Sequence, residues 1–326
     1  MLASLKYRAV VFGILMVLTA YCGAQQLSLQ GFSYKDPYKL IPAFGGLEGT
    51  IVGSATFRNQ WQGLNGHPQT FDVRLHLPLY WIRSGAGLAM GKDETGLSQQ
   101  IYLQPSFNRV FHFNKILWSF AVQLQYAYHS FDGRLVQTPD GDYTGGRVEH
   151  RDPLLDNSKS SFQMLDAGFS LALEYSGIKF GCAATSLFES GKAAFPVLYK
   201  NRRHYVIYTS YQGMVGSFKY FPSLSVYTDL NKTQTEIFLG GAYNGNIFGG
   251  IHLRGYHDES LESMGISFGF ELSSKWSVAY LHEFYLGKIP VSAVQRSQEF
   301  GLFYNFGKAI GQGRKPPVLK SPRYLD

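Results

Sequence analysis

The sequence is poor in charged residues and in long apolar runs, and both shortages narrow the class of protein that it can encode. Charged residues make up 16% of the 326 residues, whereas soluble domains carry about 25%. No run of about 18 apolar residues follows residue 24, which excludes a bundle of membrane helices. The mean hydropathy of −0.12 is nevertheless compatible with strands that alternate apolar and polar residues.

Cysteine is also scarce, with only Cys22 and Cys182 in the chain. Residues 1–24 have a positive start, an apolar core and a small-residue cleavage site before Gln25, and they predict a secretory signal peptide. Cleavage there removes Cys22, so that no intrachain disulfide can form and closure of a sheet must supply the stability. A lipoprotein anchored through Cys22 is the alternative, and the bulky Tyr21 before it is unfavourable.

The formal charge of +7 is concentrated at the two ends of the chain. Residues 1–24 carry +2 and residues 307–326 carry +4, which leaves +1 for everything between them. A nearly neutral body makes nucleic acid an unexpected partner. The basic tail 307–326 contains three prolines, and we expect an extended periplasmic segment that docks on an acidic partner or on peptidoglycan.

Aromatic residues and glycine are abundant, at 16% and 36 residues respectively. Residues 117–128 (LWSFAVQLQYAY) alternate strictly, with large apolar side chains on one face and small or polar ones on the other. Such period-two alternation predicts an extended strand, and its length matches the ~9–11 residues that cross a bilayer. Aromatic residues near both ends are typical of lipid-facing barrel strands.

The rest of the chain repeats this pattern. We predict fourteen strands, at residues 50–61, 69–79, 84–91, 98–108, 116–128, 163–175, 178–187, 204–213, 217–228, 233–243, 246–254, 262–272, 275–285 and 297–306. The connections alternate between tight turns, such as Asn244-Gly245, and long segments such as 129–162. The sequence therefore predicts an all-β fold, a transmembrane antiparallel β-barrel of the outer membrane with about fourteen strands and periplasmic termini.

Residues 25–49 precede the predicted barrel (50–306) and do not alternate. They are either a flexible lead-in or a segment folded into the barrel opening, and their aromatic residues favour packing over disorder.

Several short stretches resemble the PorP/SprF family. Residues 57–61 (FRNQW), followed by Gly66 and Pro68, are similar to the opening of that family, and residues 41–46 (IPAFGG) resemble its NPAYAG segment with Ile41 in place of Asn. The specific resemblance covers residues 41–96. The rest of the barrel resembles the family only in architecture.

This resemblance implies an outer-membrane barrel associated with type IX secretion and gliding motility in Bacteroidetes. The implied partners are a secreted protein with a type IX C-terminal domain, other type IX secretion components and outer-membrane lipid. The implied function is an accessory barrel that docks, exports or anchors that secreted protein. A passive channel for small solutes and a structural scaffold for periplasmic machinery remain as alternatives.

Alternation places Arg58 inside the barrel, where it can pair with a lumen carboxylate such as Glu299 on the last strand. The motif around Arg58 either closes the barrel and pins the N-terminal segment or binds a partner. The long loops 129–162 and 188–203 carry Arg and aromatic residues of the kind that anchor protein interfaces. The candidate partner-binding or barrel-closure residues are Arg58, Asn59, Gln60, Trp61, Gly66, Pro68, Tyr143, Arg147, Arg151, Phe195, Tyr199 and Arg202.

The sequence offers little support for catalysis or for a cofactor. Histidines and serines on the strands form no recognised nucleophile–base motif, and we expect no enzyme activity. Asp140 and Asp142 could contribute to a Ca²⁺ site but lack further ligands, so we expect a solvated turn and no metal or cofactor. The charged residues predicted to face inward suggest a cross-linked, partly filled lumen: Asp72, Arg74, Asp166, Glu174, Lys179, Arg254, Glu271 and Glu299.

Overall fold

The computed structural model describes residues 31–136, 138, 140–143, 148–151, 159–194, 197–256, 261–287 and 296–307. The predicted signal peptide (1–24), the tail beyond residue 307, Arg147 and Phe195 lie outside the described residues.

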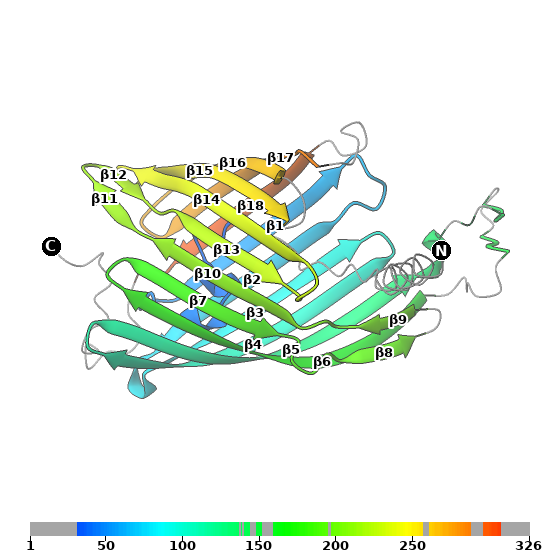
Figure 1. The fold of residues 1–326 in the computed structure, drawn as a ribbon, viewed down its shortest axis with the longest axis horizontal. Coiled ribbons are helices and arrows are strands. Elements are labelled where there is room, and N and C mark those ends of the chain that lie inside the picture. The colour runs from blue at the N-terminus through cyan, green and yellow to red at the C-terminus, as the bar shows by residue number, and fades with distance from the viewer. Residues whose placement is uncertain are drawn as a thin grey trace, which may run out of the picture.

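Fourteen antiparallel strands form a closed barrel (Figure 1). Closure is made by β1, which pairs with β2 on one side and with β18 on the other. The strands are β1 (Val52–Gln62), β2 (Gln69–Leu79), β3 (Ser84–Thr95), β4 (Ser98–Phe113), β5 (Ile116–Asp132), β6 (Lys159–Tyr175), β7 (Ile178–Thr185), β10 (His204–Tyr211), β13 (Ser223–Thr228), β14 (Thr233–Tyr243), β15 (Ile247–Tyr256), β16 (Leu261–Glu271), β17 (Trp276–Tyr285) and β18 (Arg296–Asn305). The predicted fold class is confirmed, and each of the fourteen strands overlaps one of the predicted ranges.

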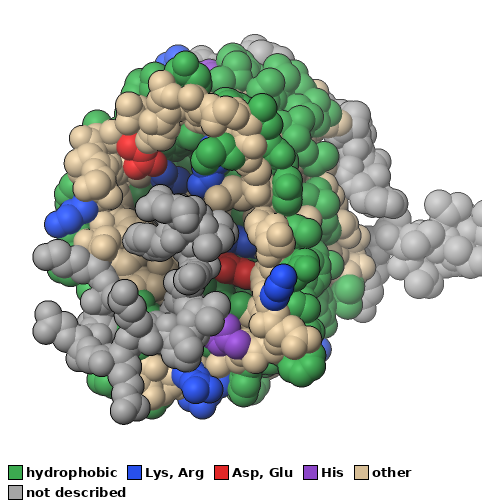
Figure 2. Space-filling model, turned by 90° about the vertical axis from the view of Figure 1, so that its left-hand side faces the viewer, with side chains coloured by type: hydrophobic (Ala, Val, Ile, Leu, Met, Phe, Trp, Pro, Cys, Tyr) green, Lys and Arg blue, Asp and Glu red, His purple; other side chains and the backbone are tan. Residues whose placement is uncertain are grey.

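Side chains alternate between the outside and the lumen as the sequence predicted. On β16, Phe268 is 49% exposed whereas the neighbouring Ser267 is 3% exposed. On β2, Phe71 and Leu75 face outward while Asp72 and Arg74 are buried. Hydrophobic side chains consequently cover much of the outer wall, and charged side chains appear inside the opening (Figure 2). An apolar outer wall is what the hydrocarbon layer of a membrane requires.

Most of the short turns lie at one end of the barrel and most of the longer connections at the other, the exceptions being the short β3–β4 turn and the long β10–β13 connection. The turns after β4, β6 and β14 place Asn114, Ser176 and Asn244 at positive φ, as tight hairpins demand. By the usual arrangement of outer-membrane barrels the short-turn end is periplasmic and the opposite end is external. β1 starts and β18 finishes at that same end, whereas the two chain termini, predicted to be periplasmic, lie outside the described residues.

Two details differ from the sequence prediction. The expected strand 217–228 is broken into β12 (Phe218–Tyr220) and β13 by Phe221 and Pro222, because proline cannot donate to the ladder. β12 forms a short hairpin with β11 (Gly213–Val215). The external segment 188–203, expected to be a loop, contains a hairpin of β8 (Gly191–Ala194) and β9 (Val197–Lys200).

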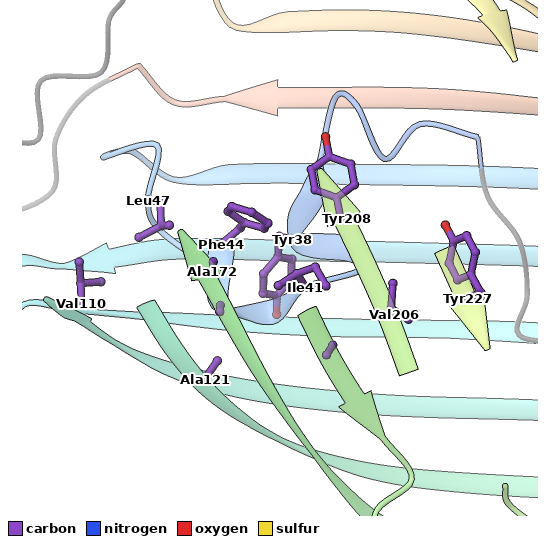
Figure 3. Close-up of a cluster of buried hydrophobic side chains, with 12 residues drawn as sticks. Tyr38, Ile41, Phe44, Leu47, Val110, Ala121, Ala172, Val206, Tyr208 and Tyr227 are labelled. Carbon is purple, nitrogen blue, oxygen red and sulfur yellow. The ribbon is translucent and has the colours of Figure 1, made fainter. Parts of the chain in front are cut away.

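Residues 31–49, here called the lumen segment, lie inside the barrel. Two 3₁₀ turns, η1 (Pro37–Lys39) and η2 (Pro42–Phe44), each start at a proline, whose fixed φ suits the first helical position. Tyr38, Ile41 and Phe44 point at the inner wall of the barrel (Figure 3) and are at most 3% exposed. The described part of the barrel therefore has its main hydrophobic core in the lumen.

The part of the barrel wall against which this core packs is built from small residues. Ala121, Ala172 and Ala183 belong to the same buried cluster as Ile41. A Cβ atom at Gly181 would come within 2.9 Å of Ile41 Cγ2 and Phe44 Cε2, so β7 needs glycine there for the segment to fit. Small inward residues on β5, β6 and β7 make the room that the lumen segment fills.

Candidate functional site

The lumen segment is tied to the barrel seam, where β1 meets β18, by a set of buried charges. Arg58 on β1 donates to Glu299 on β18 over 3.0 Å, and it also pairs with Glu283 on β17. Arg58 and Glu299 stand directly opposite each other in the β1–β18 ladder. The predicted inward orientation of Arg58 and its predicted pairing with Glu299 are thus confirmed.

The same network continues around the wall to β14 and β15. Arg254 lies 2.8 Å from Glu283 and 3.1 Å from Glu236, and His252 Nδ1 lies 3.3 Å from the second oxygen of Glu236. All of these side chains are at most 4% exposed. Buried charges are tolerated when they are paired in this manner. The lumen is cross-linked by ion pairs, as the mixed signs of its residues suggested.

Glu299 is where the wall network meets the lumen segment. Its Oε2 accepts the backbone N–H of Gly31 over 2.7 Å, and its Oε1 lies 3.6 Å from Lys39 Nζ. Burial lowers the pKa of the Lys39 ammonium to about 7, although the carboxylate of Glu299 acts in the opposite direction. The carboxylate of Glu299 therefore binds Arg58 of β1 across the seam, and it also binds Gly31 and Lys39 of the lumen segment.

A second attachment lies near the periplasmic end, between the lumen segment and β1 and β2. Ser54 Oγ donates to Asp36 over 2.6 Å, His76 Nε2 lies 3.6 Å from Asp36, and the N–H of Gly46 donates to His76 Nδ1 over 3.0 Å. Burial alone would raise the pKa of the Asp36 carboxyl, but His76 and the nearby Arg74 hold it well below its usual value. Asp36 is consequently ionised at neutral pH.

The FRNQW motif contributes to closure of the barrel along its whole length. The N–H of Gln60 donates to the carbonyl of Pro68 over 2.9 Å and closes the first external loop. Trp61 has a positive φ of 54°, and its N–H donates to Ser297 on β18 over 3.0 Å. Asn59 faces outward and pairs in register with Gln69 of β2. These contacts, together with those of Arg58, join β1 to both of its neighbours.

Gly66 shapes the first loop. It adopts φ +72°, and its carbonyl accepts the N–H of Gly96 over 2.8 Å. A Cβ at this position would meet Gly96 Cα at 3.0 Å, so the first loop and the β3–β4 turn can touch only through glycine.

The candidate residues of the long loops lie in different parts of the structure and have different surroundings. Tyr143 accepts the N–H of Thr138 over 2.7 Å and lies 3.1 Å from His150 Nδ1, so it stabilises its own loop. Tyr199 on β9 packs against His129, with ring centroids 4.4 Å apart. Arg151, at φ 49°, is exposed, and Arg202 is half-buried.

Sequence reasoning missed several members of the buried network. Glu236 and Glu283 lie at inward positions of alternating strands, and that phase could have identified them. Asp36 and Lys39 carried no such signal, because the lumen segment has no period-two pattern.

Within the described residues, no group of three or more His, Cys, Asp or Glu side chains is arranged to hold a metal ion. No helix in the described part of the chain is long and apolar enough to cross a membrane.

The closed antiparallel ring, its apolar exterior and its charge-linked lumen define an outer-membrane-type β-barrel with an internal segment. The family model described as "Type IX secretion system membrane protein PorP/SprF" matches residues 22–303. The chain belongs to the PorP/SprF family, and it is an outer-membrane protein of type IX secretion. Membership also implies interaction with other type IX secretion components. No curated protein sequence matches the chain.

Solved structures with a similar outline include two outer-membrane barrels. The Ralstonia pickettii toluene transporter TbuX is 10% identical, with a TM-score of 0.48, over 87% of this chain and 94% of TbuX. A Pseudomonas aeruginosa FadL homologue is 10% identical, with a TM-score of 0.42, over 78% of this chain and 88% of that one. The assignment of the barrel rests on its own strand pairing.

Proposed function

We propose that this barrel is an accessory of type IX secretion that docks one secreted protein at the outer membrane, through the C-terminal region of that protein. The filled lumen is the observation that carries the proposal. Residues 31–49 occupy the interior and are held there by buried ion pairs and by an apolar cluster. A lumen filled in this way supports docking over conduction. We also propose that the barrel does no chemistry and uses no cofactor.

The external loops are the proposed contact surface. They lie at the end of the barrel that faces the cell exterior, and they carry exposed or half-buried Arg151, Tyr143 and Arg202. Arginine and tyrosine are the residue types that most often anchor protein interfaces. The β8–β9 hairpin extends the wall beyond β6 at the same end (Figure 1).

A deletion strain tests the proposal. It should keep general type IX export but lose surface display of a single secreted protein, and the full-length barrel should restore that display. Loss of every type IX substrate would indicate a core component of the machinery. Normal display of every surface protein, together with steady ion conductance of the purified barrel in planar bilayers, would support a channel.

Two variants of the long loop sharpen this experiment. Asp132 and Lys159 face each other at the top of β5 and β6, so an Asn-Gly turn can join them when residues 133–158 are removed. The matched control replaces the same residues by a Gly/Ser loop of equal length. If the loop binds the partner by specific contacts, both variants should insert into the membrane and fail to display it. Display by the Gly/Ser variant would reduce the loop to a spacer.

A further inference from the structure

A cavity of about 760 Å³ lies at the external rim of the barrel, between the first loop, the β3–β4 turn and the upper ends of β5 and β6. Its volume is within the range of sites that hold small ligands, about 300–1,000 Å³. The contact between Gly66 and Gly96 brings two of its sides together. The three loop residues named above for docking, Tyr143, Arg151 and Arg202, do not line it.

The floor of this cavity belongs to the lipid-facing side of the wall. Outward residues are apolar along most of each strand, as with Phe71 of β2 and Ile101 of β4, which are 49% and 47% exposed. The next outward residue toward the external end is polar in each case, Gln69 and Gln99. Register places four outward polar residues side by side on adjacent strands, namely Gln69, Glu94, Gln99 and Ser130. The cavity therefore begins where the hydrocarbon-facing surface ends.

The polar groups of the floor are held in place by one another. Gln99 Nε2 donates to Glu94 Oε1 over 3.1 Å, and Ser130 Oγ donates to Gln99 Oε1 over 3.4 Å. Glu94 is balanced by Lys92 at 2.5 Å. Exposed Leu97 and Leu135 add apolar walls. The site thus offers donors and acceptors at low net charge beside apolar surface, which suits a hydroxyl-rich ligand with C–H faces.

We propose that this cavity binds the saccharide headgroup of a glycolipid in the external leaflet of the outer membrane. A glycolipid presents its sugars directly above the hydrocarbon layer, which is where the cavity opens. A polypeptide strand fits less well, because β2, β3, β4 and β5 are each paired on both sides and leave no ladder edge for it to extend.

The test uses the full-length barrel purified in detergent, with binding measured by microscale thermophoresis. The probes are rough lipopolysaccharide (lipid A with core sugars), the free core oligosaccharide, and lipid A alone. The double variant Glu94→Gln/Gln99→Ala removes the charge and the amide of the floor. Its control, Glu189→Gln/Gln163→Ala, makes the same two changes away from the cavity, at half-buried Glu189, which is paired with Lys200, and at exposed Gln163. Heat-modifiable mobility in SDS gels shows that each variant is folded.

The floor variant should bind rough lipopolysaccharide and the free oligosaccharide roughly tenfold more weakly or worse, the effect of losing about 1.4 kcal/mol, while the control stays within about twofold. Equal affinity for lipid A alone and for rough lipopolysaccharide would overturn the proposal, because the sugars would then contribute nothing. Unchanged binding by the floor variant would also overturn it. So would loss of display of the secreted protein by a floor variant that still binds lipopolysaccharide, which would assign the cavity to that protein.

Discussion

The lumen segment touches two walls of unlike chemistry. On the side of the seam it meets Glu299 through an ion pair and a backbone hydrogen bond. On the opposite side it packs Ile41 and Phe44 against small apolar residues of β5, β6 and β7. Apolar burial is non-directional and supplies driving force, whereas buried ion pairs gain little net stability but are costly to break. The apolar wall therefore retains the segment, and the polar wall determines where it sits.

The largest effect is expected from Glu299→Ala, which removes the polar contact between the seam and the lumen segment. The change leaves Arg58 without one carboxylate partner and Lys39 without its close one, both buried. Breaking a buried pair in this way costs about 3–5 kcal/mol, and we expect that loss in urea unfolding of the barrel in lipid vesicles. The double variant Glu299→Leu/Lys39→Met should recover much of it, because Arg58 keeps Glu283 and Arg254 keeps Glu236, so that every remaining buried charge has a partner. An unfolding midpoint equal to wild type for Glu299→Ala would show that the seam does not depend on the network.

The outer surface provides the next test. Phe268→Arg places a charge on the lipid-facing side of β16 and should cost about 2–4 kcal/mol if the site lies near the bilayer midplane. Ser267→Asn changes the adjacent residue, which faces the lumen and bonds His252, and it should be mild. The same unfolding assay compares them. Equal tolerance of the two substitutions would contradict the assignment of outward and inward faces.

The apolar wall is tested by Gly181→Val. The new side chain would crowd Ile41 and Phe44, and overpacking of this kind costs about 1–3 kcal/mol. We expect the barrel to stay folded while the lumen segment is displaced. Labelling of Ala43→Cys by a maleimide, in a Cys182→Ala background, reports the displacement, because Ala43 is fully buried in the seated segment.

Gly53→Val is the matched control, since its Cβ would make only ordinary contacts at 3.7 Å. Labelling that rises equally in both glycine variants would show that the crowding at Gly181 is not what releases the segment.

The smallest expected effect is a dependence on pH. The pKa of Lys39 is lowered to about 7 in the seated segment, whereas a lysine released into water titrates near 10.4. Between these values the released form binds more protons, so the seated form gains stability as the pH rises, by at most about 1.4 kcal/mol per pH unit. Below pH 7 both forms are protonated and the dependence vanishes.

Labelling of Ala43→Cys should accordingly become slower, relative to a fully released reference, as the pH rises from 7 to 9. Lys39→Met should abolish that trend. A trend that persists in Lys39→Met would assign it to another group.

The barrel could be predicted from sequence because it obeys one rule. Period-two alternation fixed the strands and the inward phase of Arg58 and Glu299, and closure of the ring made them neighbours. The position of the lumen segment inside the barrel could not be predicted in this way, because its two 3₁₀ turns present side chains in several directions and leave no period-two pattern. The rim cavity depends on how the first loop leans onto the β3–β4 turn through Gly66 and Gly96, a contact that leaves no periodic trace.

The bond between Gly31 and Glu299 has a consequence for the order of assembly. The two residues are 268 positions apart, and the seam pair of Arg58 and Glu299 is 241 apart, so ring closure carries a large loop entropy. The lumen segment emerges before β1 and contacts β18 across the same gap. A segment that binds both edge strands of the unclosed sheet, β1 and β18, brings these strands together before the hydrogen bonds between them form. The ring would then close around its own contents, with residues 31–49 acting as an internal template.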